Sequence, residues 1–174
     1  MRPALNAQED WRRLQHYIHP RRTQDGRGLS SDFWLEDEDP GEIIALDEAT
    51  MAELGIDPGE LARKMAWAVE LSRQDQHYCK TFASSRFTVS SAYYRMSVFC
   101  PLCDGASGNG ELLVIDNVTD EELYFPSLMP HLVSSHHFFE SPRSLYRVEP
   151  AAAHRVLRHF VIPDEFVYPP QRRS

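Results

Sequence analysis

The sequence predicts an α+β fold, and the patterning of three segments carries this prediction. Residues 57–74 open with Asp-Pro-Gly-Glu, and apolar residues then recur at helical spacing. Residues 86–99 alternate and are rich in β-branched and aromatic residues, which suits a strand. Residues 111–116 form a second short apolar run after a glycine-rich turn, so we expect the two strands to pair antiparallel.

The chain of 174 residues is predicted to have three parts. Residues 1–35 are a basic arm, in which Trp11, Leu14 and Ile18 lie at the spacing of a short amphipathic helix. Residues 36–167 are expected to form a single α+β domain, and residues 168–174 a flexible tail. The stretch 36–60 carries many acidic residues and no Lys or Arg. Its carboxylates are expected to pair within the chain, for example with the arginines of the arm.

Two helices are predicted before the strands. Asp47 is a candidate N-cap of a helix that stops at Gly55, the residue type favoured just past a helix end. Asp57 is then the N-cap of the next helix, with a proline at its first position. Trp67 lies off the apolar stripe of that helix, which predicts burial on two sides.

Two more helices are predicted after the strands. One begins with Ser127 as its cap and runs to about Glu140. The other runs from Pro150 to about Phe160. Phe138 and Phe139 are expected to close the core, together with Tyr146.

Charge and cysteine content narrow the function classes. The net charge of −8 opposes tight nucleic-acid binding, which normally needs a basic face. No apolar run approaches a membrane span, and the first residues lack the apolar core of a signal peptide. The expectation is a soluble, cytoplasmic protein. The three cysteines are too few for a disulfide scaffold, and Cys79 is expected to be structural.

Two cysteines and two histidines form the strongest chemical signal. Cys100 and Cys103 enclose a two-residue gap where a strand gives way to a turn, and His131 precedes His136 by four intervening residues. These gaps suit a tetrahedral zinc site, and His137 is the alternative fourth ligand. Five steps along a helix rotate the side chain by about 140°, so the last helical turn is expected to loosen or tighten near Ser135. The competing interpretation is two buried free thiols and surface histidines.

This order of hairpin, Cys-x-x-Cys and helical histidines resembles the C2H2 zinc finger over residues 93–140. The resemblance implies an embedded ββα module, packed with flanking helices, that holds a structural Zn²⁺ through Cys100, Cys103, His131 and His136. The chain departs from that pattern in the interval from Cys103 to His131, which has 27 residues against about twelve in the usual finger.

We therefore expect a non-enzymatic, intracellular zinc-binding protein with a protein-interaction or regulatory role, and a protein as its partner. The first alternative is a nucleic-acid-binding zinc-finger protein that uses the arginines of the arm and those near the C-terminus: Arg143, Arg147, Arg155 and Arg158. The second is a zinc-dependent hydrolase whose metal has an open position beside Asp104, Asp116 or Glu140.

Overall fold

The computed structural model describes residues 33–73, 79–103 and 105–168, with the side chains of residues 79–81 and 96 left out. The predicted helix of the basic arm and nearly all of the predicted tail lie outside these ranges. The elements in chain order are α2 (Pro40–Leu54), α3 (Pro58–Arg73), β1 (Cys79–Ala83), β2 (Phe87–Phe99), β3 (Ser107–Asp116), β4 (Glu121–Pro126), α4 (Met129–His136) and α5 (Pro150–Leu157). Helices and an antiparallel sheet confirm the α+β class.

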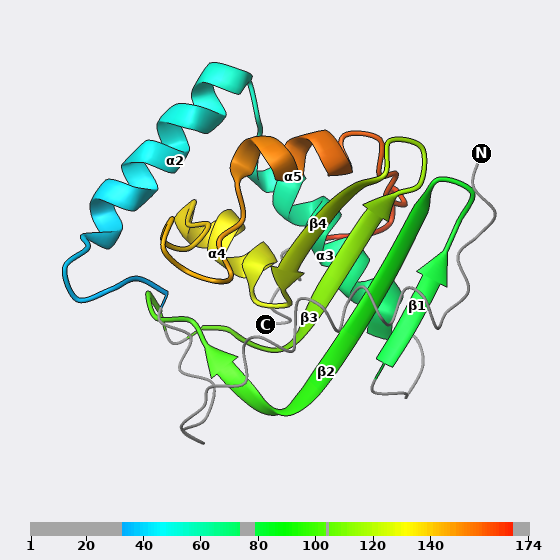
Figure 1. Ribbon diagram of the computed structural model, residues 1–174, viewed down its shortest axis with the longest axis horizontal. Coiled ribbons are helices and arrows are strands. Elements are labelled where there is room, and N and C mark those ends of the chain that lie inside the picture. The colour runs from blue at the N-terminus through cyan, green and yellow to red at the C-terminus, as the bar shows by residue number, and fades with distance from the viewer. Residues whose placement is uncertain (1–32, 74–78, 104, 169–174) are drawn as a thin grey trace.

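The strands form one antiparallel sheet in the order β1-β2-β3-β4, so β1 and β4 are its edges. Opposite residues include Val89 and Val114 between β2 and β3, and Leu112 and Phe125 between β3 and β4. Helices α3 and α5 lie on the same face of this sheet (Figure 1). The predicted antiparallel hairpin of residues 86–99 and 111–116 is confirmed as β2 and β3.

An irregularity in β2 changes which side chains face the helices. Tyr93 lies opposite Gly110, but Val98 lies opposite Gly108, so β2 carries three extra residues there. An odd number of extra residues inverts the alternation of a strand. Before the irregularity the odd-numbered Val89 faces the main core, and after it the even-numbered Val98 packs there while Phe99 is exposed. The simple alternation predicted along the whole strand is therefore wrong beyond Tyr93.

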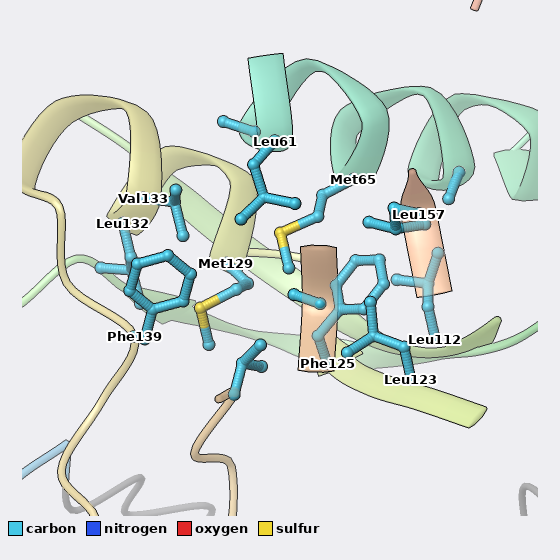
Figure 2. Packing of buried hydrophobic residues seen from close by; sticks show 14 of the residues in the cluster. Leu61, Met65, Leu112, Leu123, Phe125, Met129, Leu132, Val133, Phe139 and Leu157 are labelled. Carbon is cyan, nitrogen blue, oxygen red and sulfur yellow. The ribbon is translucent and has the colours of Figure 1, made fainter. Parts of the chain in front are cut away.

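The main apolar core lies between the sheet and the helices (Figure 2). Its buried side chains come from four helices, three strands and the segments between them, and those labelled in the figure are Leu61, Met65, Leu112, Leu123, Phe125, Met129, Leu132, Val133, Phe139 and Leu157. A smaller cluster of Ala92, Leu113 and Ile115 lies on the other face of the sheet and contacts Tyr124. Burial of both faces explains the continuous apolar run 112–115 in β3.

Helix α2 begins earlier than predicted. Its N-cap is Asp39, whose side chain accepts a hydrogen bond from the backbone N–H of Gly41, and Pro40 follows as the first helical residue. The end at Gly55 is confirmed, with a left-handed φ of 63° that glycine adopts without strain. Asp47 is not a cap: it lies within α2 and is buried.

Helix α3 is confirmed at its predicted start. The Asp57 side chain accepts hydrogen bonds from the backbone N–H groups of Gly59 and Glu60. The helix buries residues on two sides, and the half-buried Trp67 packs against Phe166 with ring centroids 5.0 Å apart.

Strands β1 and β4 were not predicted, and β3 begins earlier than expected. The turn after Cys103 ends at Ala106, because β3 begins at Ser107, which lies opposite Phe99 of β2. Strand β4 lies between the hairpin and α4, so the order is three strands and then a helix rather than ββα. Helix α5 begins at Pro150 as predicted and ends at Leu157 rather than near Phe160, and Val156, Leu157 and Phe160 are buried.

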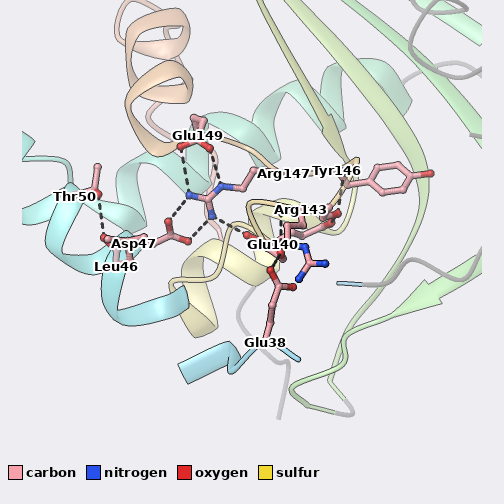
Figure 3. A network of polar contacts seen from close by, with 11 residues as sticks. Glu38, Leu46, Asp47, Thr50, Glu140, Arg143, Tyr146, Arg147 and Glu149 are labelled. Atoms are coloured by element: carbon pink, nitrogen blue, oxygen red, sulfur yellow. Dashed lines mark hydrogen bonds and ion pairs between the residues drawn. The ribbon is translucent and has the colours of Figure 1, made fainter. Parts of the chain in front are cut away.

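The acidic stretch 36–60 pairs with the segment that precedes α5 (Figure 3). Arg147 donates to both carboxylate oxygens of Asp47 and to the carbonyl of Glu140. Arg143 forms an exposed ion pair with Asp37 at 2.9 Å. These contacts fasten α2 to the chain after α4. Within the described ranges, no helix has both the length and the apolar composition needed to cross a bilayer.

Candidate metal centre

Four side chains from two distant parts of the chain meet beside the main core. Cys100 directly follows β2 and Cys103 lies in the turn that leads to β3, while His131 and His136 belong to α4. Cys100 is buried, and the other three are partly buried. Their positions depend on how the turn after β2 closes and on where α4 starts against β3.

The turn that holds the cysteines is closed by a backbone hydrogen bond. The N–H of Cys100 donates to the carbonyl of Ala106 at 2.9 Å, which brings the chain back alongside β2. Between these residues the two thiols face the same side. The two sulfurs therefore lie on the same side as the histidine nitrogens, as the spacing of the cysteines predicts for one metal site.

The start of α4 is fixed to β3 by Ser127 and by a glycine. The Ser127 hydroxyl accepts hydrogen bonds from the N–H groups of Asn109 and Gly110, at 3.1 and 3.0 Å. A Cβ atom on Gly108 would lie 2.6 Å from the backbone nitrogen of Leu128, so only glycine permits this approach. Ser127 is therefore not the helix cap that was predicted. The N-cap is Leu128, whose hydrocarbon side chain cannot make a capping bond, and the Ser127 hydroxyl binds β3 instead.

The end of α4 differs from the prediction as well. The helix stays regular through Ser135 and ends at His136, rather than loosening near Ser135 or continuing to Glu140. His137 takes a left-handed φ of 52°, and the N–H of Phe138 donates to the carbonyl of Leu132. This pattern ends a helix sharply. It directs Phe138 and Phe139 into the core, where both are fully buried as predicted, while Tyr146 is only partly buried.

The four donor atoms lie within 4.8 Å of one another. The sulfur of Cys103 is 3.3 Å from Nε2 of His131, and the sulfur of Cys100 is 3.5 Å from Nε2 of His136. The two imidazole rings cross at 77° with centroids 5.2 Å apart, so both Nε2 atoms can face one point without the rings colliding.

These distances fit a tetrahedral zinc ion. Zinc–sulfur bonds of about 2.3 Å and zinc–nitrogen bonds of about 2.0–2.1 Å give a sulfur-to-nitrogen edge of about 3.5 Å in a tetrahedron. Both observed sulfur-to-nitrogen distances are close to that edge. Two thiols and two imidazoles are also donors that suit zinc, whereas calcium and magnesium bind oxygen ligands.

The surroundings keep the imidazoles neutral. Burial lowers the pKa of His131, and the nearby His136 lowers it further. Burial likewise lowers the pKa of His136. A neutral ring has a lone pair to donate to a metal, and Nδ1 of His131 lies 3.4 Å from the Ser135 hydroxyl, which leaves Nε2 on the side of the sulfurs. Sequence reasoning missed this serine, although it lies one helical turn beyond the histidine.

The thiols are held differently. Burial raises the pKa of the Cys100 thiol, and this effect exceeds the opposing effect of hydrogen bonding from the backbone N–H groups of Leu102 and Cys103. A bound zinc ion reverses the outcome, since a coordinating thiol is deprotonated. A metal cation bound here would compensate the negative charge of the buried Cys100 thiolate, which burial alone disfavours.

The other candidates from the sequence lie elsewhere. Nδ1 of His137 is 2.7 Å from a Glu48 carboxylate oxygen, and both side chains are substantially exposed. Asp116 binds Arg86, and Glu140 accepts a hydrogen bond from Ser144 at 2.6 Å. Asp104 lies outside the described residues. Among the described residues, the only cluster of potential metal ligands is Cys100, Cys103, His131 and His136.

Comparison with protein-family models, with curated proteins and with solved structures finds no match for this chain. The cluster is consistent with a zinc-binding segment, and its ligands come from the turn after β2 and from α4. Assignment of the chain's role therefore depends on its own residues.

Proposed function

We propose that this chain is a non-enzymatic zinc-binding protein of a reducing, cytoplasmic compartment, with a structural Cys2His2 site and a role in binding another protein. One observation carries the proposal: two sulfurs and two imidazole nitrogens converge, although 27 residues separate Cys103 from His131. A closed set of four protein ligands is typical of structural zinc rather than catalytic zinc. Binding the ion would join the end of β2 to α4, so its binding energy stabilises the fold.

Among the residues that the structure describes, the cluster consists of two cysteines and two histidines and includes no carboxylate, which favours the structural role. A hydrolase needs a metal position that water or substrate can occupy. The carboxylates of Asp116 and Glu140, two of the three side chains predicted to support such a position, have other partners. The helix that carries the histidines is also packed in the core through Leu132 and Val133.

Ion pairing opposes the nucleic-acid alternative. Arginines near the C-terminus that were candidates for phosphate contacts already bind acidic side chains of the same chain: Arg143 with Asp37, Arg147 with Asp47, and Arg155 with Glu121. A paired guanidinium has less to gain from a phosphate, and the net charge of −8 repels the polyanion. Retention of the full chain on DNA or RNA at low salt, with a steep loss as salt rises, would favour the alternative instead.

Cobalt substitution tests the site itself. Zinc would be removed from the purified full chain with a chelator and replaced by Co²⁺, and the visible spectrum recorded. The proposal predicts intense tetrahedral bands together with thiolate-to-cobalt charge transfer, both absent from Cys100→Ser. Weak octahedral bands, or a spectrum that changes when a water-replacing anion is added, would indicate an open site and contradict the structural role.

A further inference from the structure

A groove lies far from the metal centre, at the opposite end of β2. Strand β2 begins at Phe87 beside the groove and ends next to Cys100. The groove has a volume of about 370 Å³ and runs between α3, the β1–β2 hairpin and the chain after α5. Its apolar lining consists of Trp67, Leu71, Phe82, Phe87, Phe160 and Val161. The volume is in the range of protein sites that hold a ligand or an anchoring side chain.

The floor of the groove is preformed, and two exposed apolar side chains stand beside it. Phe87 and Phe160 meet edge to face with ring centroids 4.9 Å apart, and both are buried. By contrast, Val161 is 84% exposed and Phe82 is 38% exposed. Exposed apolar side chains around a rigid aromatic floor are typical of a surface that binds another molecule.

The charged side chain in the lining of the groove is a cation, although the chain carries −8 overall. Arg86 and His159 line it, and none of the described lining residues is acidic. Desolvation lowers the pKa of His159, and the nearby cations Arg86, Arg158 and Lys64 lower it further, against the opposing effect of Asp116. Arg86 forms an ion pair with Asp116, and Lys64 forms one with Glu60. Arg158 is exposed and forms no ion pair within the described part of the chain. An acidic ligand would be repelled by most of the surface and attracted here.

The neighbouring strand favours a peptide over a small molecule. β1 is an edge of the sheet, and Phe82 belongs to it. An edge strand presents backbone N–H and C=O groups that an extended peptide can bind, while alternate side chains enter adjoining pockets.

We propose that the groove binds an extended segment of a partner protein in which an aromatic or branched aliphatic side chain is flanked by acidic residues. The apolar side chain would sit on Trp67 and Phe160, and the flanking carboxylates would face Arg86, Arg158 and His159. This inference rests on the protein-binding role proposed above and specifies the chemistry of its partner.

A displayed library of random heptapeptides, selected on the zinc-loaded full chain, tests the proposal. The selected peptides should carry an aromatic or aliphatic residue between aspartates or glutamates. The affinity of one selected peptide would then be measured by fluorescence anisotropy. Val161→Glu should weaken binding by about tenfold or more, since it places a charge in an apolar anchor site and opposes the acidic flanks. Leu46→Glu introduces the same charge at an exposed position of α2 and should leave binding unchanged.

Three outcomes would overturn the proposal: selection of no peptide, selection of peptides without acidic residues, or equal binding by Val161→Glu and the wild type. The zinc content of each variant separates this failure from failure of the metal site. Full zinc content without peptide binding would contradict the groove assignment alone. Peptide binding by a chain that holds no zinc would contradict the metal site and leave the groove assignment in place.

Discussion

Arg147 and Asp47 form a buried, bidentate ion pair, with nitrogen-to-oxygen distances of 2.6 and 2.8 Å. The side chains are 10% and 2% exposed, respectively. The pair joins the middle of α2 to the segment before α5, and Arg147 also binds Glu149 and the carbonyl of Glu140 (Figure 3). Helix α2 thus depends on a contact 100 residues away in the sequence.

Arg147→Leu should lower the free energy of unfolding by about 3–5 kcal/mol, because it leaves the buried Asp47 carboxylate without its cation. Urea unfolding of the purified variant measures this change. The matched control is Arg143→Leu, which removes an exposed pair with Asp37 and should cost less than about 1 kcal/mol. Equal effects of the two substitutions would contradict the structural importance of the buried pair.

His136→Ala should abolish zinc binding, whereas His137→Ala should retain one zinc per chain. The imidazole of His136 lies with the sulfurs, while that of His137 contacts Glu48. Loss of that exposed contact should change the free energy of unfolding by no more than about 1 kcal/mol. Elemental analysis and thermal unfolding of both variants measure these effects. Zinc loss in His137→Ala, with retention in His136→Ala, would reverse the assignment.

Gly108→Ala should destabilise the fold by about 1–3 kcal/mol, because the added methyl group would displace the start of α4 from β3. The nearest atom to this methyl would be the backbone nitrogen of Leu128, which cannot move independently of the helix. Gly59→Ala is the control, since the closest atom there is a side-chain oxygen of Asp57 at 3.2 Å. Denaturant midpoints measure both changes, and a neutral Gly108→Ala would show that the close approach is not required.

The Asp116 carboxylate should make stability fall in acid. Burial acts to raise its pKa, but hydrogen bonds from the Val118 N–H and from Arg86 outweigh this effect and lower the pKa below its ordinary 3.8. A carboxylate with a lowered pKa stabilises the fold above the unfolded pKa, and this contribution is lost as pH falls through the folded pKa. The stability difference between wild type and Asp116→Asn should therefore be largest above pH 5 and shrink below about pH 4.

Denaturant unfolding of wild type and Asp116→Asn across this pH range measures that difference. Asp164→Asn removes a carboxylate from an exposed position and provides the control. A difference for Asp116→Asn that stays constant down to pH 2 would contradict the assignment.

Local signals in the sequence were sufficient for several elements. The Asp57 cap, the end of α2 at Gly55 and the pairing of β2 with β3 depend on nearby residues, and the structure has all three. The Cys and His spacing also predicted that four side chains would lie together, because the two residues of each pair are close in the sequence.

Features that depend on distant contacts were missed. Strand β4 alternates Leu123 and Phe125 inward, but it has only six residues, and its place is fixed by pairing with β3. The role of Ser127 was misassigned because its hydroxyl accepts hydrogen bonds from backbone N–H groups of β3 and not from those of the helix. Asp47 was predicted to cap a helix because aspartate is a common N-cap residue. Its actual partner, Arg147, is remote in the sequence and could not be recognised from local spacing.

The zinc content of the wild-type chain tests the central claim most directly. Elemental analysis of the purified protein, alongside Cys100→Ser and Cys79→Ser, should find one zinc per chain in the wild type and in Cys79→Ser, and none in Cys100→Ser. A wild-type protein that is fully folded and free of metal would contradict the account.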